Sequence, residues 1–356
     1  MQKLVSEQKR AIVSAIDCYR QLGTKLWDCL AIPKSRIKQL SFINLLGSGS
    51  SLNASRIGQK FFESISRIPC RFYRPSEFMH VPIFPQQNSL YFFVSASGRS
   101  ENALCALDYV NSFDFHSVAI TNSPSSAMVI NSDGFLLTHL PSDTRYPCIQ
   151  SFTSQLAAQY WLANRFAVEK GLKSPQELEA VEDELVEVAK LLEKFVLDSE
   201  PKINDFCSNY ALCKNFTFVG RSFSYPLALE ASFQMKEYAP TFYSSAYPSG
   251  EFVRGPALQE NKNNPIILFS TPGESIYSTL LEDAREIKLK NGHLISFAFE
   301  GQDELVALSN YVFKLPKVPA HLSPFLIAGL MNALVLRLAA SYQHSAISAE
   351  KTPDLN

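Results

Sequence analysis

The 356-residue sequence has no excess of either charge, no pairing pattern among its cysteines and no long apolar run at its N-terminus. Its 33 basic and 34 acidic residues give a formal net charge of −1, which argues against nucleic acid or an anionic membrane as a partner. The seven cysteines are an odd number and form no CxxC pair, so a reducing compartment fits better than a disulfide framework. The first ten residues are rich in charge and show no signal-peptide core, and we therefore expect a cytoplasmic location.

The signatures of several common sites are also missing. There is no GxxxxGK[ST] loop for ATP, no GxGxxG turn followed by an acid at the spacing of a dinucleotide site, and no GxSxG turn of a serine hydrolase. No group of His, Cys and acidic residues has metal-ligand spacing, so we expect neither a metal nor another cofactor. The most apolar stretch, residues 322–340, contains Pro324, Asn332 and Arg337, and it is typical of a buried core helix and not of a membrane span.

What the sequence does have is a repeated alternation of short apolar runs and amphipathic stretches, which predicts an α/β fold with mostly parallel sheets. We expect two tandem, doubly wound, flavodoxin-like domains with helical additions. The expected divisions are an N-terminal helical arm (1–34), a first domain (35–170), a connecting helix (171–200), a second domain (201–345) and an irregular tail (346–356). The strand candidates are 42–46, 70–73, 90–95, 117–121 and 134–138 in the first domain and 216–219, 265–269, 294–299 and 311–314 in the second. The helix candidates are 51–64, 100–112, 124–130 and 151–169 in the first domain and 224–238, 275–290 and 321–342 in the second.

The two domains resemble each other in sequence. LLGSGSSLNA at 45–54 matches FVGRSFSYPLA at 218–228, and FFVSASGRSENAL at 92–104 matches ILFSTPGESIYST at 267–279. The matched glycines are separated by 173 residues (Gly47 to Gly220) and by 175 residues (Gly98 to Gly273). Two matches at nearly one offset indicate an internal repeat, although any two strand–turn–helix units look somewhat alike. Folds of this kind bind ligands at the carboxyl ends of the strands, where the strand order reverses.

Two serine-rich turns lie at such strand ends. Glycines allow a tight turn and a close approach of the backbone, and the start of a helix carries partial positive charge that suits an anion. Hydroxyl groups add hydrogen-bond donors. Each turn alone is also explained by helix capping, but the pair predicts a site for a phosphate or a sugar phosphate. The residues of the two turns are Ser48, Gly49, Ser50 and Ser51 in the first and Ser95, Ala96, Ser97 and Ser100 in the second.

These motifs, with QSFTSQL at 150–156, resemble the sugar isomerase (SIS) domain family. The resemblance is greatest to the isomerase half of glucosamine-6-phosphate synthase and to the stand-alone fructosamine-6-phosphate deglycases, and it spans about residues 35–345. Its most specific part is GRSFSYPLALEASFQMKEYAPTFYSSAYPSGEFVRGP in the second domain. The resemblance implies that the serines of both turns, together with Gln150, bind the phosphate and the sugar.

The resemblance also implies acid–base residues. Glu237 falls on the general base that moves a proton between C1 and C2, and Glu230 falls on a supporting acid. Their spacing of seven residues is two helical turns, so both carboxylates are expected on one helix face, where they could act as base and acid in turn. The alternative is a solvated helix face or an ion pair with Lys236 or Arg221.

Several residues depart from the family pattern. The family lysine one turn before the base is Gln234, and the histidine assigned to ring opening is Arg254, which cannot shuttle a proton but could polarise an oxygen or bind an anion. Lys351 is the candidate for the closing lysine of the tail, and His321, at the start of the last helix, is a further candidate.

From this resemblance we expect an enzyme that transfers a proton between C1 and C2 of a sugar 6-phosphate, either a fructosamine-6-phosphate deglycase or an amino-sugar-phosphate isomerase or deaminase. The sequence shows no cysteine-first glutaminase domain, so we expect no use of glutamine. The competing hypothesis is a non-catalytic phosphosugar sensor. The family further implies a homodimer whose site is completed by the neighbouring subunit around Glu251 to Arg254.

Overall fold

The short apolar runs form nine of the ten parallel strands in the part of the chain that the structure describes. This structure is a computed structural model that describes residues 1–80, 88–141, 143, 147–256 and 263–350. The strands form two sheets of five, ordered β2-β1-β3-β4-β5 and β10-β9-β8-β6-β7. The chain divides into two units, Ser6–Lys190 and Met1–Val5 with Leu191–Asn356, each holding one sheet. The fold is therefore α/β with two doubly wound domains, as the sequence predicts.

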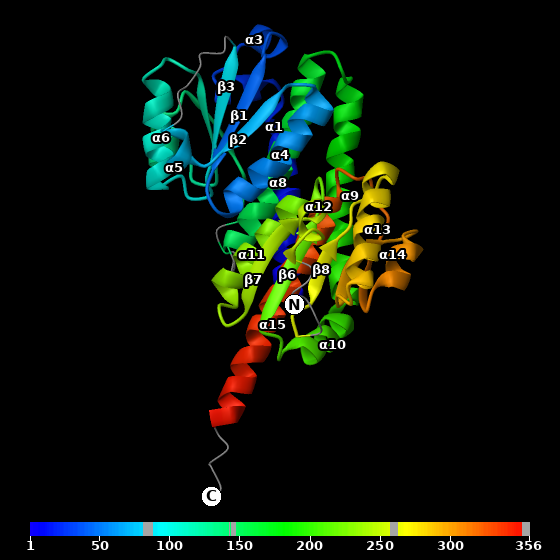
Figure 1. Cartoon of the computed structure of the whole chain (residues 1–356). Helices are drawn as coiled ribbons and strands as arrows, with labels where there is room; N and C mark the ends of the chain where they lie inside the picture. The colour runs from blue at the N-terminus through cyan, green and yellow to red at the C-terminus, as the bar shows by residue number, and fades with distance from the viewer. Residues whose placement is uncertain (81–87, 142, 144–146, 257–262, 351–356) are drawn as a thin grey trace, which may run out of the picture. The chain divides into compact units, whose positions relative to one another are not determined.

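The unit Ser6–Lys190 has helices on both faces of its sheet (Figure 1). Its strands are β1 (Phe42–Gly47), β2 (Cys70–Tyr73), β3 (Ser89–Val94), β4 (Ser117–Thr121) and β5 (Gly134–Leu137). Its helices are α1 (Gln2–Leu22), η1 (Gly23–Lys25), α2 (Leu26–Cys29), α3 (Lys34–Lys38), α4 (Ser50–Phe61), η2 (Phe62–Ser66), α5 (Pro75–Phe78), α6 (Glu101–Asn111), α7 (Ala127–Asn131), α8 (Pro147–Glu169) and the first part of α9 (Pro175–Asp198).

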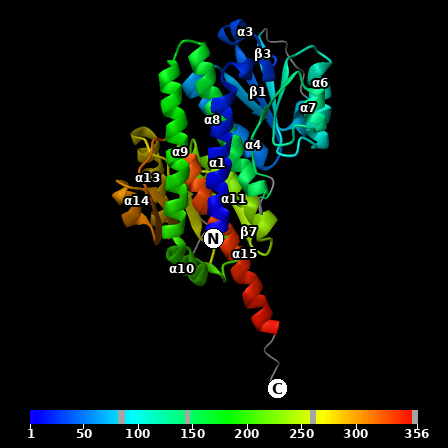
Figure 2. The ribbon, with the colours of Figure 1, turned by 180° about the vertical axis from the view of Figure 1, so that it is seen from behind.

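Both faces of this sheet are apolar because helices cover both. Leu46 and Phe93 pack on one face in a cluster with the buried side chains of α5, α6 and α7. On the other face the Phe92 ring stacks on Phe62 at a centroid distance of 6.0 Å and lies 6.3 Å from Phe166 of α8. The view from behind shows α1, α4 and α8 on this side (Figure 2). A parallel sheet buried on both faces explains why its strands are continuous apolar runs.

The second unit repeats this plan. Its strands are β6 (Asn215–Gly220), β7 (Tyr243–Pro248), β8 (Ile266–Phe269), β9 (Leu294–Phe299) and β10 (Tyr311–Leu315). Its helices are the last part of α9, α10 (Glu200–Tyr210), α11 (Ser224–Tyr238), α12 (Ser249–Phe252), α13 (Glu274–Leu289), α14 (Asp303–Leu308) and α15 (Ser323–Glu350). One face of the sheet packs on α12, α13 and α14, and Phe216 and Phe313 on the other face contact Phe206 of α10.

Most expected elements are present within a few residues of their expected bounds. The structure adds helices that were not expected, α3, α5, α10, α12 and α14. Three further differences concern β7, the N-terminal arm and the tail. The strand β7 has no counterpart among the strand candidates, because it is an edge strand whose residues are only half-buried and whose sequence, YSSAYP, lacks an apolar run. The N-terminal helical arm is divided at Gly23, which has a φ of 50°. The expectation of an irregular tail from residue 346 is wrong in part, because α15 continues to Glu350.

The apolar helix near the C-terminus is long enough to cross a membrane. Among the helices in the described ranges, the segment Ser323–Ser341 of α15 meets the length and composition test, with a mean hydropathy of 1.6. Core helices of soluble proteins meet the same test, and 78% of this segment is buried inside the structure. Its packing on α10 and α11 therefore supports the sequence interpretation of a core helix.

Candidate functional site

The loop after β1 turns sharply into α4, and two glycines make the turn possible. Gly49 is the N-cap of α4 with a φ of 55°, a conformation that residues with a Cβ rarely adopt. A Cβ on Gly47 would lie 2.8 Å from the carbonyl carbon of Ser51, so only glycine allows this approach. No side-chain hydrogen bond caps α4, and its dipole places partial positive charge beside Ser48. Capping therefore does not explain the serines of this loop.

The second loop lies directly beside the first. β1 and β3 are neighbours, and their register pairs Gly47 with Val94, so both loops begin at the same level of the sheet. The Ser95 hydroxyl accepts a hydrogen bond from the Gly98 N–H at 3.2 Å, and the Ser97 hydroxyl accepts one from the Arg99 N–H at 3.3 Å. Each hydroxyl keeps its own proton to donate. The loop backbone thus holds two hydroxyl groups in place as donors.

These loops occupy the topological switch point of the first sheet. In the order β2-β1-β3-β4-β5 the winding reverses between β1 and β3, which is where doubly wound folds bind their ligands. Ser48 and Ser97 are exposed there, and Ser100 begins α6 without forming a side-chain cap. The structure thus brings together Ser48, Gly49, Ser50, Ser51, Ser95, Ala96, Ser97 and Ser100 on two adjacent loops. We name this set the hydroxyl cradle.

Gln150 has a different environment from the cradle. It lies in α8 and is fully buried, and its amide nitrogen donates a hydrogen bond to Glu7 of α1 at 3.1 Å. Its carbonyl oxygen has no partner among the described residues. The resemblance places Gln150 among the binding residues, whereas its observed contact joins two helices.

A third loop supports the cradle and was missed by the sequence reasoning. The Thr121 hydroxyl and the Asn122 N–H, at the end of β4, donate to the Ala96 carbonyl at 3.2 and 3.0 Å. Gly98 has a φ of 61°, and a Cβ on it would lie 2.2 Å from the Ser126 hydroxyl oxygen. The expected helix 124–130 begins only at Ala127. The polar run TNSPSS directly after a strand was the available signal for this loop.

The two candidate glutamates lie in the other unit, on α11, in different environments. Glu230 is fully buried and accepts a hydrogen bond from the Gln234 amide at 3.0 Å. Glu237, in the last turn of α11, is exposed and forms no hydrogen bond or ion pair with any residue in the described ranges. Arg221 pairs with Asp283, so the alternative of an ion pair between Glu237 and Arg221 does not hold.

The remaining candidates are spread over separate segments of this unit. Arg254 is exposed just after the short helix α12, and its N–H bonds to the Glu251 carbonyl at 3.3 Å. His321 is half-buried in the turn before α15. Lys351 lies outside the described residues.

The second switch point, between β6 and β8, has the same turn but different chemistry. Ser222 has a φ of 56°, as Gly49 does at 55°, and a Cβ on Gly220 would lie 2.4 Å from the Ser224 carbonyl oxygen. In place of Ser48 stands Arg221, whose guanidinium bonds to Asp283 at 3.0 Å and to the Ser249 hydroxyl at 2.9 Å. This arginine already has its partners within the protein, whereas the first switch point presents exposed hydroxyls.

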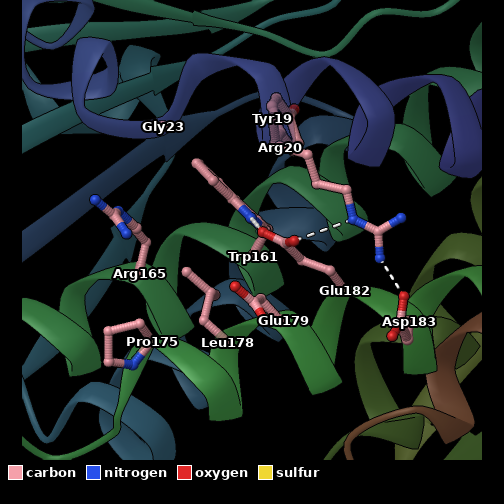
Figure 3. A pocket seen from close by; sticks show the side chains of 10 residues that line it. All are labelled: Tyr19, Arg20, Gly23, Trp161, Arg165, Pro175, Leu178, Glu179, Glu182 and Asp183. Atoms are coloured by element: carbon pink, nitrogen blue, oxygen red, sulfur yellow. Dashed lines mark hydrogen bonds and ion pairs between the residues drawn. The ribbon is translucent and has the colours of Figure 1, made fainter.

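A separate cavity of about 470 Å³ lies among α1, α8 and α9 in the unit Ser6–Lys190 (Figure 3). The buried Glu182 carboxylate accepts a bond from the Trp161 indole N–H at 2.8 Å and one from the Arg20 Nε–H at 3.1 Å. Arg20 also pairs with the exposed Asp183. Most charged groups of this cavity therefore satisfy one another, which indicates a structural role. Among the residues that the structure describes, no three His, Cys, Asp or Glu side chains are grouped as metal ligands.

The sequence belongs to the SIS domain family, whose model matches residues 37–165 and 210–344. A glutamine–fructose-6-phosphate aminotransferase [isomerizing] of Clostridium tetani is 26% identical over 357 residues, covering 100% of this chain and 57% of that protein. The chain thus spans about half the length of the curated relatives it matches. The C-terminal domain of glucosamine-fructose-6-phosphate aminotransferase from Francisella tularensis superposes with a TM-score of 0.81 at 21% identity, covering 95% of each chain. A glucosamine-6-phosphate deaminase from Thermotoga maritima superposes with a TM-score of 0.70 at 18% identity, covering 99% of this chain and 98% of that one.

Proposed function

We propose that this SIS domain protein binds a sugar 6-phosphate in the hydroxyl cradle and transfers a proton between C1 and C2 of the sugar. The observation that carries the proposal is the pair of adjacent serine loops at the first switch point, with exposed hydroxyls and two helix starts without side-chain caps. The curated relatives and structural neighbours are named as enzymes of sugar phosphates, which supports the same ligand class.

The preferred reaction is that of a fructosamine-6-phosphate deglycase. A base removes a proton from C1, which gives an enaminol, and a proton added at C2 leaves an imine at C1. Water hydrolyses the imine and releases the amine and an aldose 6-phosphate, so all atoms balance without a redox step. On a ketose phosphate that carries no amine, the same proton transfer is an aldose–ketose isomerisation. When the amine released by hydrolysis is ammonia, the reaction is a deamination. We assign the base to Glu237, with Glu230 in support.

Arg254 fits a substrate that is already open. Its guanidinium stays charged at working pH, so it can polarise an oxygen or bind an anion but cannot open a sugar ring by passing a proton. We further propose that the protein works in the cytoplasm as a homodimer, with residues near Arg254 contributing to the site of the neighbouring subunit. His321 and Lys351 remain further candidates for acid–base work.

The second candidate function is a phosphosugar sensor without catalysis. Two observations favour it: Glu237 is exposed, and Arg254 stands in place of a histidine. A sensor would bind the same ligands in the hydroxyl cradle without converting them.

A thermal-shift screen tests the ligand class first. Fructose 6-phosphate, glucose 6-phosphate, glucosamine 6-phosphate and a fructosamine 6-phosphate are compared on the wild type and on Ser97→Ala. A ligand at 100 times its dissociation constant stabilises the folded state by about 2.7 kcal/mol, which is measurable. A shift that disappears in Ser97→Ala supports the cradle as the site, and no shift with any ligand rejects the ligand class.

A turnover assay then separates the two functions. Glu237→Gln should lower the release of amine or sugar phosphate by about 10²–10⁴-fold, the usual contribution of a general base. The control is Glu282→Gln, which changes an exposed glutamate of α13 in the same unit. Binding without turnover in the wild type would establish the sensor, and turnover that Glu237→Gln leaves intact would remove Glu237 from the mechanism.

A further inference from the structure

Two exposed arginines border the hydroxyl cradle. Arg74 directly follows Tyr73, the last residue of β2, which pairs with Leu46 of β1. Arg99 lies within the second loop of the cradle, after β3. Because β1 is placed between β2 and β3 (Figure 1), the two arginines follow strands on opposite sides of the first serine loop.

Neither guanidinium has a counter-charge among the residues that the structure describes. No hydrogen bond or ion pair involves the Arg74 or Arg99 side chain in the described ranges, and the nearby acids Glu77 and Glu101 are exposed and not paired with them. Several other arginines of this unit have side-chain partners: Arg10 and Arg20 bind carboxylates, and Arg71 lies over the Phe42 ring. Within the described part of the chain, the cradle is thus bordered by two cations that lack counter-charges.

Arg99 lies beside the start of a helix, where an anion is favoured. It immediately precedes Ser100, the N-cap of the 11-residue helix α6. The N-terminal end of a helix has partial positive charge, so a cation is unfavourable there and an anion is favourable. A bound anion that contacts Arg99 would therefore be stabilised by the guanidinium and by the helix dipole together.

The spacing of the strands limits what can bridge the two arginines. Neighbouring strands are about 4.8 Å apart, so the ends of β2 and β3 are about 10 Å apart across β1. Flexible arginine side chains can reach inward from both ends of this span. A phosphosugar with an anionic group at each end matches this span and offers each arginine a partner of its own.

We propose that the ligand carries a second anionic group besides its 6-phosphate, either another phosphate or a carboxylate. Arg74 and Arg99 determine this specificity. The proposal rests on the phosphosugar function proposed above. Each guanidinium would form charge-assisted hydrogen bonds with an anionic group, and these are stronger than bonds between neutral partners.

Calorimetric titration of three probes tests the proposal at an ionic strength of about 0.15 M, where exposed charges more than about 8 Å apart are largely screened. The probes are fructose 6-phosphate, fructose 1,6-bisphosphate and 6-phosphogluconate. We expect at least one doubly anionic probe to bind about tenfold more tightly than fructose 6-phosphate. The two doubly anionic probes distinguish a second phosphate from a carboxylate.

Matched variants assign the effect to the two arginines. Arg74→Gln and Arg99→Gln should each remove most of the tenfold preference, while the affinity for fructose 6-phosphate falls less than the affinity for the doubly anionic probe. Arg67→Gln is the control, because Arg67 is an exposed arginine that precedes β2 and so lies at the amino-terminal ends of the strands, away from the cradle. It should leave all three affinities unchanged.

The outcomes separate this inference from the function on which it rests. If fructose 6-phosphate binds, and Ser97→Ala abolishes that binding, but neither doubly anionic probe binds more tightly, the cradle stands and the second-anion specificity is wrong. Equal losses for all three probes in Arg74→Gln and Arg99→Gln also overturn it, because the arginines then supply only a general positive field. Absence of binding by every probe rejects the phosphosugar function and this inference with it.

Discussion

Glu182 provides a quantitative test of the structure beside the cavity. The residue is 6% exposed, and its two carboxylate oxygens each accept one hydrogen bond, from the Trp161 indole and from the Arg20 guanidinium. In Glu182→Ala the buried indole N–H loses its acceptor, which costs about 1–3 kcal/mol. Loss of the charge-assisted bond to the partly exposed Arg20 adds up to about 1 kcal/mol. We expect the free energy of unfolding to fall by about 1–4 kcal/mol.

Urea denaturation followed by Trp fluorescence measures this change directly. Asp183→Ala is the matched control, because Asp183 binds the same arginine but its side chain is 76% exposed. An exposed ion pair contributes at most about 1 kcal/mol, so the control should lose much less stability. Equal losses in the two variants would refute the reasoning, since burial of the carboxylate would then not matter.

Three further outcomes follow from local geometry. Gly47→Ala should abolish sugar phosphate binding in the thermal-shift assay and cost about 1–3 kcal/mol, because the new Cβ meets the Ser51 backbone at 2.8 Å. Gly255→Ala is the control for stability, which it should leave unchanged because a Cβ there has nothing within 4 Å. Burial lowers the pKa of His139 from 6.5, so the folded state favours the neutral ring. The resulting contribution to the free energy of unfolding is fully present above pH 6.5 and is lost as the pH falls through the lower pKa of the folded state. His139→Asn should therefore reduce the loss of stability between neutral and acidic pH in urea titrations. Ser126→Ala should cost about 1 kcal/mol in the same assay, because the hydroxyl caps α7 by accepting a bond from the Val129 N–H.

Much of the hydroxyl cradle could be predicted from sequence because its chemistry is local. The glycines at 47, 49 and 98 are required by turns that follow strands, and the serines are adjacent to them in the chain. Strand candidates could be found because a parallel sheet covered on both faces needs apolar runs. The edge strand β7 was missed for the same reason, since its residues are half-buried and need no such run.

Features that join distant segments could not be predicted in the same way. The partnership of Arg221 with Asp283 connects residues 62 positions apart, and that of Trp161 with Glu182 connects two helices. The difference between the buried Glu230 and the exposed Glu237 is another example. A spacing of seven residues places both side chains on one face of the helix, but it does not reveal which segments pack against each turn.

The sequence by itself determined the α/β class, the internal repeat, the serine loops and the SIS family, because periodicity, turn glycines and short motifs are properties of neighbouring residues. Only the tertiary structure decided that β1 and β3 are adjacent, that the two serine loops form one cradle, and that Arg74 and Arg99 follow the strands beside it. The physical reason is that strand order and ion pairing depend on which segments meet in space. Those meetings are selected by burial of the whole apolar surface and not by any single stretch of the chain.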